Sequence, residues 1–139
     1  MSSINRWAWV EVDLTALKAN VSVLVKQAGA SQLWATVKAN GYGHGAVEVA
    51  RAALSAGASG MCVALADEAH ELREAKIAAP ILIVSEQPDV AFEQMLRDEV
   101  VATVYNEATI KNYAAVATRL GVVGKVHFCL LYTSDAADE

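Results

Sequence analysis

The sequence predicts an α/β fold in which short parallel strands alternate with amphipathic helices. Six short apolar runs without regular polar alternation are typical of strands buried in a parallel sheet. The segments between these runs have helical periodicity, and from the second run onward the strands recur roughly every 20–25 residues, a typical βα period. Both a doubly wound open sheet and a (β/α)₈ barrel give this pattern, so periodicity alone leaves the two architectures open.

The strands are expected to be short and continuous. The second one, Leu33–Val37, contains a single polar residue, Thr36, so we expect it to be buried on both faces. In chain order the expected strands are Ala8–Val12, Leu33–Val37, Gly60–Leu65, Ile81–Val84, Val100–Val104 and Lys125–Phe128.

The helices between the strands have recognisable ends. Asp13 is a suitable N-cap for the first helix and Gly29 follows its last turn. The apolar face of that helix is expected to consist of Leu14, Leu17, Val21 and Leu24. The remaining helices are expected at 46–55 with a stop at Gly57, at 67–76, from about Pro88 onward, and from after Asn106 to Leu120.

Composition limits the function classes. The chain has 139 residues, 55% of them hydrophobic, which indicates one globular domain with a substantial core. The net charge is −5 and no basic cluster occurs, so nucleic acid is not an expected partner. No apolar run approaches the roughly 20 residues of a membrane span, and the polar start lacks a signal-peptide core, so we expect a cytoplasmic protein.

Lys38 is the candidate catalytic residue. It stands where the second apolar run ends, and partial burial at such a place disfavours an ammonium and favours a nucleophilic amine. Such an amine can form a Schiff base with a carbonyl compound. Gly41, Gly43 and Gly45 follow, which permit positive φ and lead into a helix N-terminus that favours an anion such as phosphate. The alternative is a solvated lysine with no role, in a plain α/β fragment.

The segment Val37-Lys38-Ala39-Asn40-Gly41-Tyr42-Gly43-His44-Gly45 closely resembles the pyridoxal-phosphate lysine motif of the alanine racemases. The opening Trp7–Leu14 is similar to the N-terminal strand of that family, and the resemblance extends with decreasing specificity to Phe128. It implies an incomplete (β/α)₈ TIM-type barrel, with Leu33–Val37 as the first of about five barrel strands out of eight. It places the strand Ala8–Val12 before the barrel.

The resemblance also implies a domain organisation. Residues 1–128 correspond to the N-terminal part of a barrel domain that binds pyridoxal 5′-phosphate, and the family's C-terminal β domain is expected to be absent. Residues 129–139 resemble a translated sequencing adapter and are expected to be a non-native tail. Cys129 departs from the family, which has at this position a lysine that braces an arginine on the cofactor ring.

The activity implied is the interconversion of L- and D-alanine, which supplies D-alanine for cell-wall synthesis. Lys38 would hold pyridoxal 5′-phosphate as a Schiff base and serve as one base, and Tyr42 would bind the cofactor phosphate. The family's second base is a tyrosine from the partner subunit of a homodimer, and it lies outside this chain. The fragment alone is therefore expected to be inactive and, because its fifth strand has an unpaired edge, poorly folded. Related barrels, namely amino-acid decarboxylases, serine or broad-specificity racemases and cofactor carriers, are the alternatives.

Other polar residues are expected to be structural. Asn40 and His44 belong to the motif, but loop shaping and ligand contact both remain open for them. We expect His70 and the carboxylates at helix ends, Glu68 and Asp98 among them, to be solvated. His127 could point into the barrel, although a packed or hydrogen-bonded histidine is favoured. No metal-ligand spacing occurs.

Overall fold

The structure, a computed structural model, describes residues 9–129 and consists of one parallel sheet with helices along one side. Its five strands lie in the order β1-β2-β3-β4-β5, and every neighbouring pair is parallel. They are β1 (Trp34–Thr36), β2 (Gly60–Val63), β3 (Ile81–Ile83), β4 (Val101–Val104) and β5 (Lys125–Phe128). The predicted α/β class with sequential parallel strands is confirmed.

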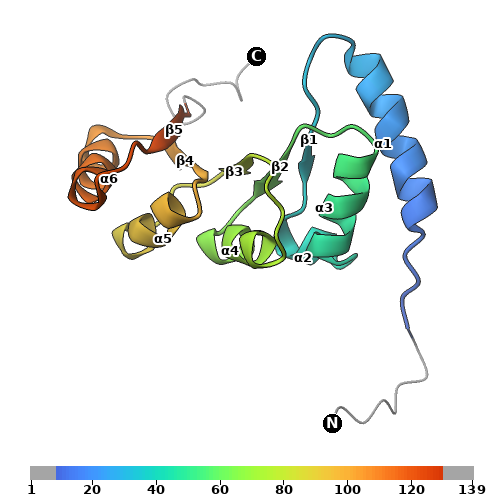
Figure 1. Cartoon of the computed structure of the whole chain (residues 1–139), viewed down its shortest axis with the longest axis horizontal. Coiled ribbons are helices and arrows are strands. Elements are labelled where there is room, and N and C mark those ends of the chain that lie inside the picture. Colours follow the sequence, from blue (N-terminus) through green and yellow to red (C-terminus); the bar gives the residue numbers. More distant parts are fainter. Residues whose placement is uncertain (1–8, 130–139) are drawn as a thin grey trace, which may run out of the picture.

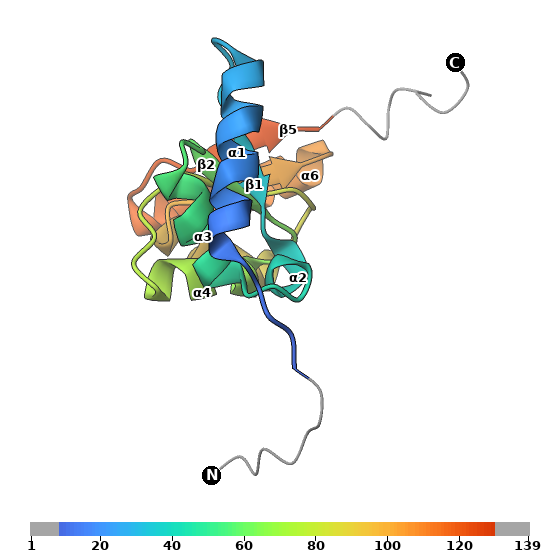
Figure 2. The same cartoon turned by 90° about the vertical axis from the view of Figure 1, so that its right-hand side faces the viewer.

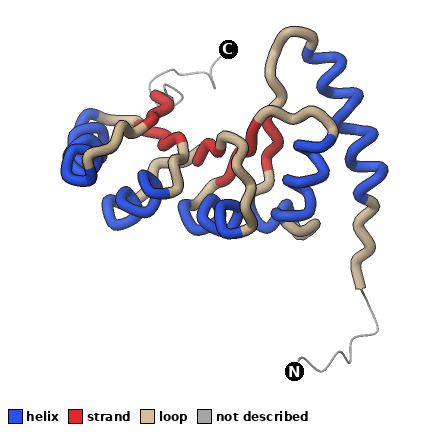
Figure 3. The backbone as a smooth tube through the Cα atoms, in the orientation of Figure 1, coloured by secondary structure: helices blue, strands red, loops and turns tan. Residues whose placement is uncertain are grey.

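The helices alternate with the strands. They are α1 (Leu14–Ala28), the short turn α2 (Lys38–Tyr42), α3 (Ala46–Ser55), α4 (Ala66–Glu74), a 3₁₀ turn η1 (Asp89–Ala91), α5 (Phe92–Arg97) and α6 (Glu107–Leu120). Figure 3 shows the strands as one curved row with α3, α4, α5 and α6 on the same side. Parallel strands require such crossovers, because each must return to the same end of the sheet before the next begins.

The core lies between the sheet and these helices. Met61, Val63, Ile81 and Ile83 point to the helices and are fully buried. The other face of the sheet, which we call the open face, carries the row Thr36, Cys62, Leu82, Val101 and Lys125, aligned by the strand register. These side chains are half-buried or exposed. The expectation that residues 33–37 are buried on both faces is therefore wrong, because within residues 9–129 helices cover only one face.

Helix α1 lies at the β1 end of the sheet and packs on the outside of α3 (Figure 2). Asp13 caps it as predicted, accepting hydrogen bonds from the Thr15 and Ala16 backbone N–H groups at 2.8 and 3.0 Å. Its packed face differs from the expected one by a single position. Leu24 is 51% exposed, while the half-buried Val25 lies against Gly57.

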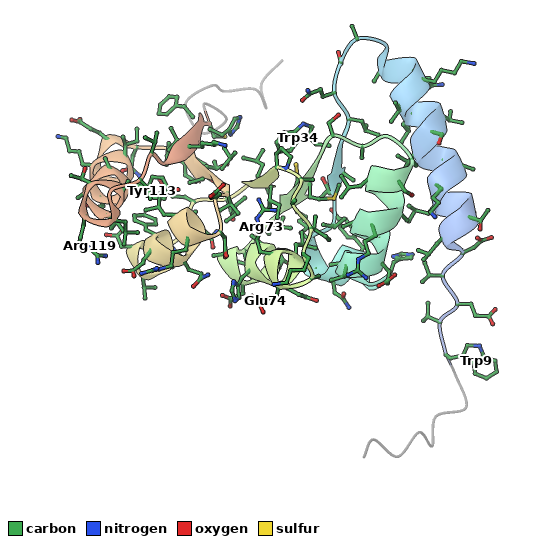
Figure 4. All side chains as sticks on the ribbon, viewed as in Figure 1. Trp9, Trp34, Arg73, Glu74, Tyr113 and Arg119 are labelled. Atoms are coloured by element: carbon green, nitrogen blue, oxygen red, sulfur yellow. The ribbon has the colours of Figure 1, made fainter. Side chains whose placement is uncertain are left out.

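The strand expected at Ala8–Val12 is not formed in the described part of the chain. Residues 9–12 have no ladder partner, and Trp9 and Val10 are each 78% exposed. Figure 4 shows Trp9 on a segment that runs away from the body of the molecule. A strand needs a neighbour for its backbone groups, and no strand within residues 9–129 lies beside this segment. Ala8 lies outside the described residues.

Arg73 (Figure 4) joins α4 by hydrogen bonds to the end of α5 and to the connection before β3. Its guanidinium donates to the backbone carbonyls of Asp98 at 2.8 Å, Ile77 at 2.6 Å and Ala79 at 2.8 Å. Burial lowers the pKa of Arg73, and the nearby charges of Asp98 and Glu99 oppose that shift. The side chain thereby supplies hydrogen-bond donors to carbonyls at the end of α5 and in the connection before β3.

Helices α5 and α6 pack through an aromatic pair. The rings of Phe92 and Tyr113 meet edge to face with centroids 5.2 Å apart, a favourable geometry. Both residues are buried, and the Tyr113 hydroxyl has no hydrogen-bond partner within the described residues. Burial raises the pKa of Tyr113 to about 12. A buried hydroxyl without a partner costs free energy, since it has lost its hydrogen bonds to water.

We therefore expect Tyr113→Phe to stabilise the fold at pH 7 by about 1 kcal/mol, because it removes an unsatisfied hydroxyl and keeps the ring. A tyrosine pKa that is higher in the folded state also makes stability fall with alkali. The contribution of protonated Tyr113 to the free energy of unfolding is retained below pH 10 and is lost as the pH rises to about 12. Thermal unfolding at pH 7 and between pH 9 and about 12 measures both effects. A variant whose alkaline loss equals that of the parent protein would contradict the assignment.

Candidate functional site

Lys38 lies at the carboxyl end of β1, the position that the sequence predicted. The preceding Val37 is fully buried and continues the ladder, its N–H donating to the Cys62 carbonyl at 2.9 Å. Lys38 is half-buried and starts α2. Within residues 9–129 its amine has no ion pair or hydrogen bond. Lys38 is therefore a partly buried residue whose amine has no described partner.

The backbone after Lys38 forms a left-handed turn. Ala39, Asn40, Gly41 and Tyr42 have φ values of 52°, 54°, 61° and 54°. Positive φ was expected at the glycines, and Gly41, Gly43 and Gly45 confirm it. It was not expected at the other three residues; the left-handed region costs roughly 1–2 kcal/mol each at Ala39 and Tyr42, whereas asparagine enters it more readily. We call residues 38–45 the lysine turn, and so strained a turn needs specific contacts to hold it.

Hydrogen bonds within the lysine turn supply part of that support. The Asn40 carbonyl accepts from the N–H groups of Gly43 at 3.0 Å and Gly45 at 2.9 Å, and His44 Nδ1 lies 2.9 Å from the Gly41 carbonyl. The Asn40 side-chain oxygen accepts from the Ala46 N–H at 2.9 Å. For Asn40 and His44 the structure thus shows loop-shaping contacts. Because Ala46 is the first residue of α3, the N–H expected to favour an anion there is already used by Asn40.

Tyr42 lies at the end of the left-handed turn and is 62% exposed. Its phenol is on the same turn as the Lys38 amine, so one short segment carries both candidate groups. Gly41 next to it is buried, and a Cβ there would lie 3.4 Å from the Ala46 backbone nitrogen. That distance is an ordinary van der Waals contact, so the left-handed φ of 61°, and not lack of space, explains the glycine at position 41.

Glu68, on the first turn of α4, was expected to be a solvated carboxylate, and that expectation is wrong. One carboxylate oxygen accepts from the Ala39 N–H at 2.5 Å, and the other accepts from the Ala64 and Leu65 N–H groups at 2.8 and 3.0 Å. Glutamate at the third helix position commonly accepts the N-cap N–H, which gives a sequence signal for the contact with Leu65. No such signal indicates the contact with Ala39.

Further polar contacts join the other loops along the carboxyl edge of the sheet. Gln87 accepts from the Ala66 N–H at 3.1 Å and donates to the Ala64 carbonyl at 3.0 Å. Glu86 accepts from the Tyr105 N–H at 3.1 Å and from the Asn106 side chain at 3.2 Å. The loops that follow β1, β2, β3 and β4 are thus connected one to the next by carboxylate and amide side chains.

The histidines outside the lysine turn have structural contacts. His70 was expected to be solvated, but its Nδ1 lies 3.1 Å from Asp98 Oδ2 and 3.1 Å from Gln94 Nε2. It therefore links α4 to the end of α5, because Asp98, also expected to be solvated, turns its carboxylate toward α4. His127 Nδ1 lies 3.4 Å from Thr103 Oγ1 on the neighbouring strand, a marginal hydrogen-bond distance.

Other sites for chemistry are not evident in the described residues. A hollow of about 380 Å³ between α5, α6 and the start of β5 is lined by Leu96, Val100, Tyr113 and Gly124, at the amino edge of the sheet, opposite the edge that carries Lys38. Burial raises the pKa of the half-buried Cys62 thiol, which makes it a poor nucleophile. Residues 9–129 contain no cluster of three metal-ligating side chains. None of their helices combines the length and the apolar character that crossing a bilayer requires.

Comparison with known proteins gives a consistent result. The family model described as "Alanine racemase, N-terminal domain" matches residues 12–130. Alanine racemase 1 of Oceanobacillus iheyensis is 44% identical over 123 residues, which are 88% of this chain and 33% of that protein. The alanine racemase of Clostridium perfringens is 38% identical over 125 residues, 90% of this chain and 32% of the relative.

Solved structures agree with this result. The alanine racemase of Bacillus anthracis with bound L-Ala-P has a TM-score of 0.83 at 35% identity, over 91% of this chain and 33% of that one. The alanine racemase of Streptomyces coelicolor has a TM-score of 0.80 at 32% identity, over 84% of this chain and 32% of that one. The five parallel strands match part of the barrel in these structures, and the chain spans about a third of the length of the curated relatives.

Proposed function

Because the chain belongs to the alanine racemase family, we propose that it forms the lysine-bearing part of an enzyme that interconverts L- and D-alanine with pyridoxal 5′-phosphate. The family is dependent on this cofactor, and Lys38 is the residue proposed to hold it covalently. In the proposed organisation, residues 1–128 are the first part of the barrel domain and residues 129–139 are a non-native tail, of which all but Cys129 lie outside the described residues. The proposed enzyme is a cytoplasmic homodimer.

The residues of the lysine turn fit such a cofactor. Lys38 is half-buried, and its amine has no described partner and is of the type that bonds with an aldehyde carbon. The exposed phenol of Tyr42 can donate a hydrogen bond to a phosphate oxygen. When bound, the cofactor supplies an electron sink that acidifies the α-hydrogen of the amino acid joined to it. The proposed roles of both residues are therefore consistent with the chemistry of their side chains.

The amine of Lys38 has a second proposed role. When not bonded to the cofactor, the neutral amine of Lys38 would be able to remove or return a proton at the α-carbon of the substrate from one face. Racemisation needs a base on each face, and none of the described residues is assigned to the other. The lysine turn is held by its hydrogen bonds and limits the directions available to the Lys38 side chain. It would therefore keep the amine on one side of the substrate.

The observation that carries this proposal is the placement of the Lys38 amine. It lies at the carboxyl edge of a parallel sheet, on a left-handed turn held by hydrogen bonds, and within residues 9–129 nothing neutralises it. In α/β barrels the carboxyl edge of the strands is the edge that carries active sites.

The test uses a chimera in which residues 1–128 replace the equivalent part of Oceanobacillus iheyensis alanine racemase 1. Borohydride reduction of the chimera with pyridoxal 5′-phosphate should attach the cofactor to Lys38, as read by peptide mass mapping. The Lys38→Ala chimera is the control and should carry no label. Attachment to another lysine, or to none in a folded chimera, would contradict the proposal.

Substrate class is tested in the same chimera. We expect the circular dichroism of L-alanine to decay to zero as the racemic mixture forms, with slower decay for L-serine. Faster racemisation of serine would indicate a serine or broad-specificity racemase. Release of carbon dioxide would indicate a decarboxylase, and a labelled chimera without turnover would indicate a cofactor carrier.

A further inference from the structure

We propose that Glu68 is a positioning residue for Lys38, acting through the backbone of the lysine turn. This inference rests on the proposed function, since it concerns how the same amine is presented. The Glu68 side chain is half-buried on the first turn of α4, and both of its oxygens accept hydrogen bonds from backbone N–H groups. Hydrogen bonds to an ionised acceptor are stronger than those to a neutral one.

The two carboxylate oxygens of Glu68 accept hydrogen bonds from different segments of the chain. One accepts from Ala64 and Leu65 at 2.8 and 3.0 Å and so holds the connection between β2 and α4. The other reaches across to the Ala39 N–H, 29 residues earlier in the chain. Only the second contact involves the lysine turn. A helix cap for α4 needs the first oxygen alone, so the cap does not explain the contact with Ala39.

The contact with Ala39 fixes Lys38 from its C-terminal side. On its N-terminal side, the Val37 N–H is held by the Cys62 carbonyl at 2.9 Å. Lys38 therefore stands between two backbone amides that are both anchored to the β2–α4 segment. Ala39 is also the first left-handed residue of the turn, with φ of 52°. Without an acceptor for its N–H, this residue is free to return to the more favourable right-handed region, which would turn the Lys38 side chain away.

The experiment compares Glu68→Gln, Glu68→Asp and Asp67→Asn in the chimera. Glutamine has one oxygen where the glutamate has two, so it cannot accept on both sides. Aspartate keeps the charge in the first turn of α4 but is one methylene shorter, which removes its reach to Ala39. Asp67 is the matched control, because it is exposed on the same turn and no hydrogen bond joins it to the lysine turn.

Two readouts separate positioning from folding. The first is the rate at which the apo-chimera attaches added pyridoxal 5′-phosphate to Lys38, trapped by borohydride, and the second is hydrogen exchange of the Ala39 amide. We expect both Glu68 variants to attach the cofactor at least about tenfold more slowly and to exchange the Ala39 amide at least about tenfold faster. Asp67→Asn should match the parent chimera in both. Thermal unfolding shows that each variant is folded at the assay temperature.

The outcomes distinguish this inference from the proposed function. If the parent chimera attaches the cofactor at Lys38 and folded Glu68→Asp does so at the same rate with unchanged exchange at Ala39, the positioning role is wrong and the proposed function stands. If Glu68→Gln fails to fold, Glu68→Asp still decides, because it retains the charge at the start of α4. If the parent chimera carries no label at Lys38, both proposals are overturned.

Discussion

Replacing Lys38 by arginine in the chimera should lower the turnover of alanine by at least about 10³-fold, with little change in the unfolding temperature. Arginine keeps the charge and an apolar stem of similar length. Its guanidinium stays protonated at any working pH, so it can neither attack an aldehyde nor accept the α-proton. Little stability should be lost, because Lys38 is only half-buried and makes no ion pair or hydrogen bond within residues 9–129.

Lys26→Arg is the control for this change. Lys26 is exposed and lies in the last turn of α1. Its substitution is also lysine to arginine, but at a position with no proposed catalytic or binding role. Turnover of the Lys26 variant should match the parent chimera. Turnover is measured from both L- and D-alanine. If the Lys38 variant retained more than about a tenth of the parent rate, the amine would not be the reacting group, and the proposed function would have to be abandoned.

The position of Lys38 could be predicted from the sequence because it depends on local features. An apolar run shows where a buried strand ends, and the lysine follows directly after that run. The glycines of the lysine turn likewise indicate positive φ by their chemistry alone. The same holds for Asp13 at the start of α1, whose side chain accepts from N–H groups two and three residues away.

The features that could not be predicted depend on contacts distant in sequence. The left-handed conformation of Ala39 relies on the Glu68 carboxylate, which the βα connections bring to it from 29 residues away. Periodicity assigns Glu68 to a helix end but does not say which N–H groups lie beside it. The absent strand at 9–12 has the same origin, since a strand forms only where a neighbour is available to pair with it.

The open face of the sheet provides the second large effect that we predict. Trp34 (labelled in Figure 4) lies on β1 and is paired in register with Gly60 on β2, and its indole lies close to the space above that glycine. A Cβ at position 60 would lie 2.6 Å from Trp34 Cδ2 and 2.7 Å from Cε3. Because those atoms belong to the fused ring and not to the end of a flexible chain, the indole must move as a whole. Gly60→Ala should therefore destabilise the chimera by about 2 kcal/mol, measured by urea unfolding.

A double-mutant cycle tests whether the effect of Gly60→Ala depends on the Trp34 indole. In a Trp34→Ala background the three atoms nearest to a Cβ at position 60 are absent, and alanine is favoured over glycine within a strand by roughly 0.5–1 kcal/mol. The effect of Gly60→Ala should then change sign, from destabilising to neutral or slightly stabilising, as followed by far-ultraviolet circular dichroism. This corresponds to a coupling between the two positions of about 2 kcal/mol. Equal effects of Gly60→Ala in both backgrounds would show that the indole does not occupy the space above Gly60, and that another constraint selects glycine there.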